Sequence, residues 1–293
     1  MDPTPRDILW LVGYPVLLAA VVMLATRPWR RGRDLAGWGA AVAIAGGFMI
    51  AFVHHFDVPP FPPASAQQWI FFLAVPLAAV GVATAMVRSK WFGIVAPVVI
   101  LGVVPWLMLR KFNFETPELR WAWIGGGAMA IIAWWAGMEP LARRGRGGSL
   151  PLLLALVIGI TGLAIIDGGI RTLGEATGSV AFPLIIIAIA ATRARGASMA
   201  RGGALVFAGL FGGLLICGRL LGYPGVPLLH VALLALAPLA AWAGELPGLG
   251  KPDSWKRFAV RAVAVLVVLA LPAISAINGL KGTLDEQYES YSY

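Results

Sequence analysis

The amino-acid sequence predicts an all-α protein, a polytopic transmembrane helical bundle of about ten spans with both chain ends on the outer, non-cytoplasmic face. Three observations predict it: an apolar composition, ten separate apolar runs, and the alternation of basic residues between those runs. The 293 residues are 59% hydrophobic and 13% charged, whereas soluble domains average about 45–50% apolar and about 25% charged residues. A bilayer core solvates this excess of apolar side chains, and a water-soluble fold has no room to bury it.

The apolar runs are close to the length needed to cross a hydrocarbon core of ~30 Å at ~1.5 Å per residue. They cover residues 8–26, 35–53, 69–87, 92–109, 121–138, 150–166, 179–192, 203–221, 226–243 and 258–277. Helices are predicted because unpaired peptide groups in hydrocarbon cost several kcal/mol. Residues 1–277 are therefore expected to form a single transmembrane helical domain, which an inverted repeat would divide into five-plus-five halves near 139–149. Residues 278–293 are expected to be a polar, flexible outer tail.

The distribution of basic residues predicts the orientation of these spans. If the first span enters from outside, most of the 23 lysines and arginines lie in loops on the inner face, notably around residues 27–33, 143–146 and 251–261. Most of the 14 acidic residues then lie outside. The positive-inside rule therefore predicts a multi-pass protein of the cytoplasmic (inner) membrane with both ends outside.

Composition also excludes several classes of function. The net charge is +9, but the cations are scattered in short runs, so no basic face for nucleic acid is predicted. The single cysteine, Cys217, excludes an intrachain disulfide and a multi-cysteine metal site. The motifs of phosphate-binding loops, zinc proteases, covalent haem sites and serine hydrolases are absent. The expected partners are the lipid bilayer and other membrane proteins.

Ionisable residues close to membrane depth are the candidate ligand or gate residues, because such residues are costly in hydrocarbon. They are His54, His55, Asp57, Asp167, Arg171, Glu175, Arg219 and His230. They fall toward the predicted outer face. No residue is predicted to be catalytic, and no metal site is predicted.

Two adjacent histidines and an aspartate, His54, His55 and Asp57, follow the second span. Imidazole and carboxylate groups together bind divalent metals or relay protons near neutral pH. Adjacent histidines point in different directions on a helix, so they rarely serve one metal unaided. The simpler interpretation is a helix end followed by a proline-stiffened interfacial loop.

Asp167, Arg171 and Glu175 are spaced at i, i+4 and i+8 after the sixth span. A continuous helix would place all three on one face, where they pair with one another. Gly168 and Gly174 are among the glycines that favour a loop or a re-entrant turn instead. The cluster is therefore either a solvated salt bridge or a gate for an ionic substrate.

Two further candidates lie near the later spans. Arg219 is the deepest cation. One interpretation is that it binds a phosphate or a carboxylate; the other is that its side chain extends outward to the interface. His230 lies about one turn inside the ninth span. If that helix touches the second span, His230 pairs with His54 or His55, and two such histidines would bracket a haem or hold a divalent metal.

Small residues and tryptophans carry packing signals. Gly209 and Gly213 form a GxxxG pair, and prolines lie inside several spans. These indicate close helix packing with ordinary kinks, or helices broken around a binding site. Trp134 and Trp135 are expected, with other tryptophans, in the interfacial aromatic belt.

The chain length and the five-plus-five plan resemble the drug/metabolite transporter superfamily, although no motif is shared and those proteins are expected to have both ends in the cytoplasm. The leading hypothesis is a secondary transporter or permease for a small solute. One alternative is a non-catalytic subunit or assembly factor of a larger membrane complex, since no charge is predicted at mid-membrane. Another is an enzyme that uses a histidine on a lipid-linked substrate at the outer leaflet.

Overall fold

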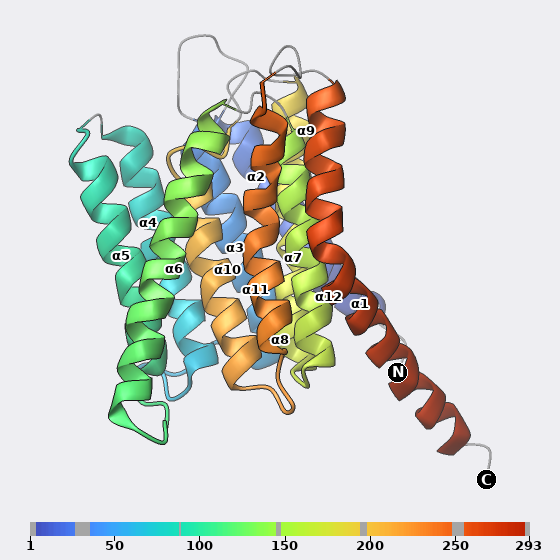
Figure 1. Cartoon of the computed structure of the whole chain (residues 1–293). Coiled ribbons are helices and arrows are strands. Elements are labelled where there is room, and N and C mark those ends of the chain that lie inside the picture. Colours follow the sequence, from blue (N-terminus) through green and yellow to red (C-terminus); the bar gives the residue numbers. More distant parts are fainter. Residues whose placement is uncertain are drawn as a thin grey trace.

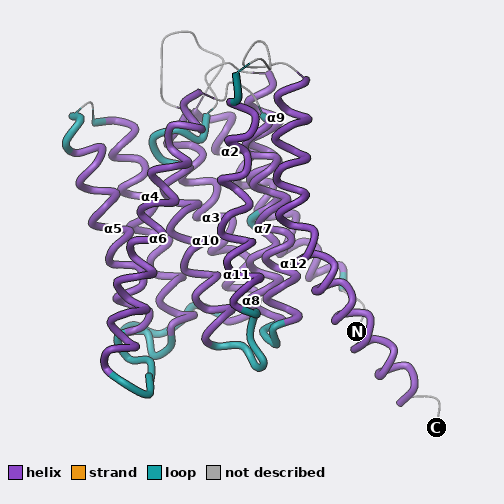
Figure 2. Tube along the Cα trace, in the orientation of Figure 1, coloured by secondary structure: helices purple, strands orange, loops and turns teal. Residues whose placement is uncertain are grey.

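The computed structural model describes residues 4–26, 36–87, 89–144, 148–193, 198–247 and 255–290, with side chains as far as Gly282. Over these residues the protein is all-α, and its helices run side by side as an elongated bundle (Figures 1 and 2). The helices are α1 (Pro5–Ile8), the π-helical η1 (Leu9–Gly13), α2 (Tyr14–Thr26), α3 (Ala36–Phe56), α4 (Ala66–Met86), α5 (Phe92–Leu109), α6 (Pro117–Arg144), α7 (Ser149–Asp167), α8 (Arg171–Ser179), α9 (Ala181–Arg193), α10 (Gly203–Leu220), α11 (Leu228–Ala240), the 3-10 helix η2 (Ala241–Glu245) and α12 (Trp255–Ser290).

Nine helical stretches in the described ranges are long and apolar enough to cross a membrane. They are Pro5–Thr26, Gly37–Phe56, Ala66–Met86, Phe92–Leu109, Ser149–Asp167, Arg171–Arg193, Gly203–Leu220, Leu228–Glu245 and Trp255–Gly282. Helix α6 is outside this set because its tryptophans and glycines lower its mean hydropathy, yet it has 28 residues and runs along the bundle beside its neighbours (Figure 1). The prediction of a polytopic bundle is confirmed.

The outward-facing side chains agree with a lipid environment. Leu17, Val99 and Val267 are 58%, 59% and 70% exposed, and they belong to three different helices. A water-soluble protein would expose few such side chains in continuous stripes, whereas lipid tails contact them favourably. The direction in which the bundle crosses the membrane stays a prediction, and many of the loop cations that support it, such as residues 27–33 and 251, lie outside the described residues.

Three helix boundaries differ from those predicted. The first helical stretch begins at Pro5, because Thr4 and Asp7 form a reciprocal capping box ahead of it. Helix α6 continues to Arg144, so Glu139 lies within a helix and not in a loop. The predicted span at 179–192 begins earlier, at Arg171, as the short helix α8 followed by α9.

The C-terminal helix is also longer than its apolar run. Helix α12 continues beyond Ile277 to Ser290. Side chains after Gly282 and residues 291–293 lie outside the described part of the chain, so the flexible tail stays a prediction.

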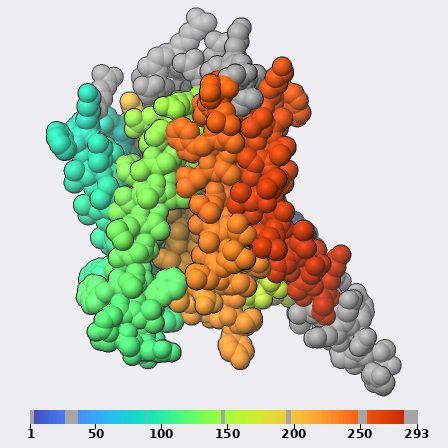
Figure 3. Space-filling model, viewed as in Figure 1, coloured from blue at the N-terminus to red at the C-terminus, as the bar shows by residue number. Residues whose placement is uncertain are grey.

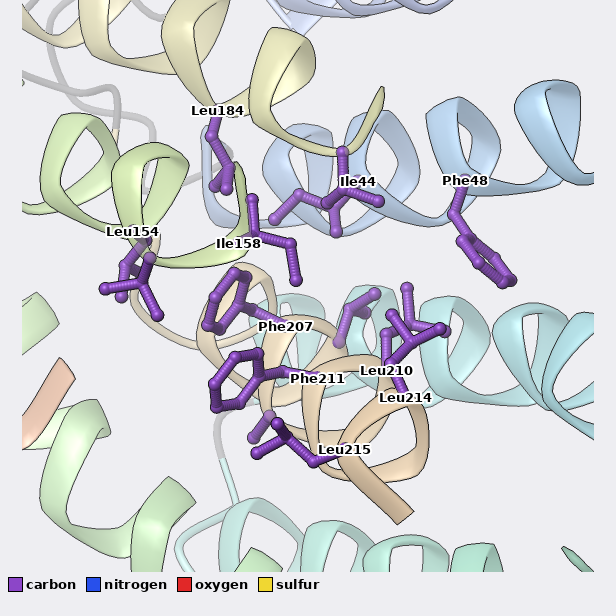
Figure 4. Close-up of a cluster of buried hydrophobic side chains, with 14 of the residues drawn as sticks. Ile44, Phe48, Leu154, Ile158, Leu184, Phe207, Leu210, Phe211, Leu214 and Leu215 are labelled. Atoms are coloured by element: carbon purple, nitrogen blue, oxygen red, sulfur yellow. The ribbon is translucent and has the colours of Figure 1, made fainter. Parts of the chain in front are cut away.

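Helix α10 lies at the centre of the bundle, and nearly all of its residues are buried. It packs against α3, α4, α5 and α6 on several sides, and it is visible between α6 and α11 in the space-filling view (Figure 3). Figure 4 shows its Phe207 and Phe211 among apolar side chains of neighbouring helices, including Ile158 of α7. The centre of the described bundle is therefore a packed apolar core.

The GxxxG pair confirms the close-packing interpretation. A methyl group built on Gly209 would lie 2.6 Å from Leu77 Cδ2 of α4, and one built on Gly213 would lie 2.7 Å from Ile70 Cδ1 of the same helix. The two glycines therefore let α10 and α4 approach closely, as small residues do between membrane helices.

The aromatic-belt prediction is wrong for two tryptophans. Trp134 and Trp135 are 6% and 8% exposed, so both are core residues of the bundle. Trp134 stacks on Phe207 and Phe211 of α10, with ring centroids 5.5 and 5.1 Å apart. The pair lies in the interior because α6 extends about two turns past the point where the apolar run ends, which moves it away from the helix end.

Candidate functional site

Two consecutive histidines at the end of α3 contact carboxylates from two other helices. His54 Nε2 lies 2.9 Å from Asp7 Oδ1 of α1. His55 Nε2 lies 3.1 Å from Glu175 Oε2 of α8, an ion-pair distance without hydrogen-bond geometry. Consecutive helical residues are rotated by about 100°, which is why the two imidazoles reach different partners.

The contacts continue on both sides of the histidines. The two imidazole rings are 4.9 Å apart at their centroids. Glu175 Oε1 accepts a hydrogen bond of 2.8 Å from Arg171 Nε. Asp7, His54, His55, Glu175 and Arg171 thus form one series of contacts, called here the histidine–carboxylate chain.

Burial is greatest in the middle of this chain. The side chains of His54 and His55 are 13% and 12% exposed, whereas Asp7 and Arg171 at the two ends are 35% and 67% exposed. The indole of Trp10 stacks on His54 with a centroid distance of 5.7 Å. The arrangement links α1, α3 and α8 at one end of the bundle, and its terminal groups reach solvent or lipid headgroups.

A glycine turn brings α8 to this position. Helix α7 ends at Asp167, and Gly169 has a φ of 94°, which glycine adopts without strain. A side chain at Gly169 would also collide with the main chain of Tyr223. The chain then enters α8 at Arg171, so the predicted glycine break is confirmed, while the segment after the break is a helix and not a loop.

The turn decides which of the three spaced residues meet. Arg171 and Glu175 share α8 and form the predicted i, i+4 ion pair. Asp167 belongs to α7, so the alternative of one continuous helix, in which all three would share a face, does not apply. Its carboxylate lies against Gly279 of α12 and within electrostatic range of His230 of α11.

The remaining candidates lie apart from the histidine–carboxylate chain. Asp57 is exposed and adopts a φ of 54°, with its N–H donating to Val53 O at 3.0 Å, so it ends α3 as the simpler interpretation predicts. Arg219 is in the last turn of α10. The contacts of His54 and His55 go to α1 and α8, whereas His230 is on α11, so the structure does not bring the three histidines together.

No group of three or more histidine, cysteine, aspartate or glutamate residues in the described ranges is arranged to hold a metal ion. The histidine pair predicted to bracket a haem would need His230 beside His54 or His55. His54 and His55 instead contact carboxylates of α1 and α8, and His230 lies near Asp167 of α7, which fits neither a shared metal nor an axial ligand pair.

Two buried ion-pair groups at the opposite end of the bundle were missed by the sequence analysis. Glu139 is 6% exposed. It accepts a hydrogen bond of 2.8 Å from Arg143 Nε and one of 2.9 Å from the main-chain N–H of Arg201. Arg261 is 2% exposed, contacts Glu245 and donates to Ser149 Oγ at 3.0 Å. The positive-inside rule predicts the cations of both groups in loops, within residues 143–146 and 251–261.

The sequence indicates these two ion-pair groups at one point only, the i, i+4 spacing of Glu139 and Arg143. It predicts an ion pair if the helix continues through both residues. The apolar run ends before Glu139, so the continuation of α6 could not be inferred from hydropathy.

A polar cavity of about 530 Å³ adjoins Glu139. It lies between α4, α5, α6 and α10, and it is called here the polar cavity. Its lining contains apolar residues, including Trp135 and Leu205, and four charged ones: Lys90, Glu139, Arg143 and Arg201.

No protein-family model matches the chain, and searches of curated proteins and of solved structures found no significant match. The length, apolarity and arrangement of the described helices identify the chain as a polytopic integral membrane protein.

Proposed function

We propose that the protein is a secondary transporter for a small anionic solute in a cytoplasmic membrane. The observation that carries this proposal is the polar cavity, which opens at one end of the bundle while the histidine–carboxylate chain links three helices at the other end. A carrier alternates between an inward-open and an outward-open state, and in each state one end of the bundle is open while the other end is closed.

The charges of the polar cavity favour an anion. Its volume of about 530 Å³ falls in the range of small-molecule pockets, roughly 300–1,000 Å³. Glu139 is already paired with Arg143 and with the N–H of Arg201. Lys90 and the Arg201 guanidinium form no ion pair with a described acid, although Arg201 lies within electrostatic range of Glu139. Three cations and one carboxylate line the cavity, so an excess of positive charge is left for a carboxylate or phosphate.

The cavity ends at a packed layer. Leu205 of α10 lines the cavity, and the neighbouring Leu77 and Leu101 are completely buried. Solute movement past this layer requires α10 and its neighbours to shift. Such a shift would open the far end only if the contacts from α3 to α1 and α8 separate, so the histidine–carboxylate chain would act as the gate.

The proposed orientation puts the polar cavity on the inner face. In the sequence, most lysines and arginines fall in the segments that are predicted to connect the helices on this side, such as residues 27–33, 143–146 and 251–261. The positive-inside rule assigns those segments to the cytoplasm. Both chain ends then lie outside, together with the histidine–carboxylate chain.

Cysteine labelling tests the orientation. With Cys217→Ala as the background, Phe61→Cys places a thiol in the exposed loop after α3, and Ser89→Cys places one in the exposed loop after α4. An impermeant maleimide added to intact cells is expected to label position 61 and not position 89. Permeabilised cells should allow both to react. Labelling of position 89 alone in intact cells would reverse the orientation.

Counterflow in proteoliposomes tests the transport activity. A panel of radiolabelled carboxylates and phosphate esters is expected to contain an anion whose exchange falls at least tenfold in Lys90→Gln and Arg201→Gln. Lys111→Gln, an exposed cation at the other end of the bundle, is the matched control and should keep full exchange. Absence of counterflow for every solute, together with a stoichiometric protein partner after mild solubilisation, would instead favour a subunit of a larger complex.

A further inference from the structure

An apolar cavity of about 360 Å³ lies between α6, α10 and α11. It is called here the lateral groove. Its α10 wall consists of Ala208, Phe211, Gly212, Leu215 and Ile216. In the space-filling view it lies where α10 is visible between α6 and α11 (Figure 3), so it opens on the lipid-facing side of the bundle. It is separate from the polar cavity, which lies on the other side of α6.

Two indoles hold the helices together at one end of the lateral groove. Trp134 Nε1 of α6 donates to Ala235 O of α11 at 2.8 Å, and Trp242 Nε1, just after α11, donates to Gly137 O of α6 at 3.0 Å. Each accepting carbonyl lies three residues before a helix proline, Pro238 or Pro140. A helix proline disturbs the preceding turn, which makes carbonyls there available to other donors.

The dimensions of the groove match a hydrocarbon chain. Its α6 wall runs from Leu119 to Trp134, which at ~1.5 Å per residue is about 22 Å, roughly three quarters of a ~30 Å hydrocarbon core. Gly126, near the middle of this wall, has no atom within 4 Å of the position that a Cβ would take. The backbone of α6 is therefore exposed to open space there.

A cation continues the same face of α10. Arg219 follows Leu215 and Ile216 at i+4 and i+3, so it lies one turn beyond the groove on the face that lines it. Its guanidinium is partly exposed, and it makes no ion pair or hydrogen bond with any side chain that the structure describes. Guanidinium groups bind phosphate oxygens in pairs of charge-assisted hydrogen bonds.

We propose that the lateral groove binds one acyl chain of an anionic phospholipid, with the lipid phosphate held by Arg219. The apolar wall provides the site for the chain, and the unpaired cation at its end selects the headgroup. The proposal is independent of transport, because none of these residues lines the polar cavity.

Spin-labelled lipids in proteoliposomes test the proposal, through the fraction of label that the protein immobilises. Phosphatidylglycerol is expected to associate about tenfold more tightly than phosphatidylcholine. Arg219→Gln should remove this preference, since one charge-assisted contact corresponds to about a tenfold change in affinity. Arg219→Lys should retain part of it.

Gly126→Leu fills the groove and should release both lipids. Gly125→Leu is the matched control, because a Cβ at Gly125 also has no atom within 4 Å and the residue does not line the groove. Equal lipid binding in these two variants, or an unchanged headgroup preference in Arg219→Gln, would overturn the proposal. Arg219→Gln keeps a long polar side chain at a partly exposed position, so it tests the proposal even if Gly126→Leu fails to fold.

Discussion

His54 and His55 are consecutive in the chain, and their imidazoles contact carboxylates on two different helices, Asp7 of α1 and Glu175 of α8. One peptide unit therefore connects two tertiary contacts. The end of α3 is held to α1 and to α8 at the same time, and movement of either helix breaks a polar contact of a mostly buried imidazole.

The contact of His55 with Glu175 is expected to stabilise the position of α8. In a double-mutant cycle with His55→Phe and Glu175→Gln, measured at an acidic pH where the imidazole is protonated, we expect a coupling energy of about 0.5–1 kcal/mol, as for other partly exposed ion pairs. Unfolding of the purified protein by sodium dodecyl sulfate measures it. Glu115→Gln, an exposed acid at the same end of the bundle, should show no coupling with His55→Phe. Additive single effects would show that the two groups do not interact.

Replacement of Glu139 should reveal the cost of an unsatisfied main-chain donor. Glu139→Leu leaves the N–H of Arg201 without its acceptor at a partly buried position, and we expect the free energy of unfolding to fall by about 1 kcal/mol. Glu139→Gln keeps one acceptor oxygen and should lose less. The matched control is Glu118→Gln in the exposed first turn of α6. Equal stability of Glu139→Leu and wild type would contradict this account.

The two indole hydrogen bonds between α6 and α11 make a separate prediction. Trp134→Phe and Trp242→Phe each keep an aromatic ring and lose one N–H donor, so each should lower the unfolding free energy by about 0.5–1.5 kcal/mol. Thermal unfolding of the purified protein in detergent, followed by circular dichroism, measures this change in stability. Trp121→Phe, at a residue 62% exposed, should have no effect. A loss of similar size in Trp121→Phe would mean that the donors are not responsible.

Gly202 lies where three segments of main chain meet. A Cβ there would lie 2.8 Å from the carbonyl oxygens of both Gly37 and Gly81. Backbone atoms cannot rotate away as a side chain can, so Gly202→Ala should destabilise the protein by about 1–3 kcal/mol or prevent its accumulation in the membrane. Gly125→Ala, with open space at its Cβ, should be tolerated. Normal yield and stability of Gly202→Ala would show that α3 and α4 can separate there without cost.

Local composition was sufficient to predict the helices because the requirement that a bilayer imposes is local. Each span must satisfy its peptide groups internally and present apolar side chains over about 20 residues, and nine stretches meet that requirement in the described chain. The boundaries of α6 and α8 were not predicted, because hydropathy does not detect a helix where its sequence is polar. Helix α6 continues past its apolar run, and α8 is a polar helix that hydropathy does not reveal.

The sequence by itself determined that this protein is a bundle of membrane helices, and the spacing of Arg171 and Glu175 predicted one ion pair correctly. Only the tertiary structure decided the other partners. Asp7 meets His54 across 47 positions and Glu139 meets the N–H of Arg201 across 62. Hydropathy is a property of each segment alone, whereas these pairings depend on which helices become neighbours, and that choice follows from side-chain packing summed over the whole bundle.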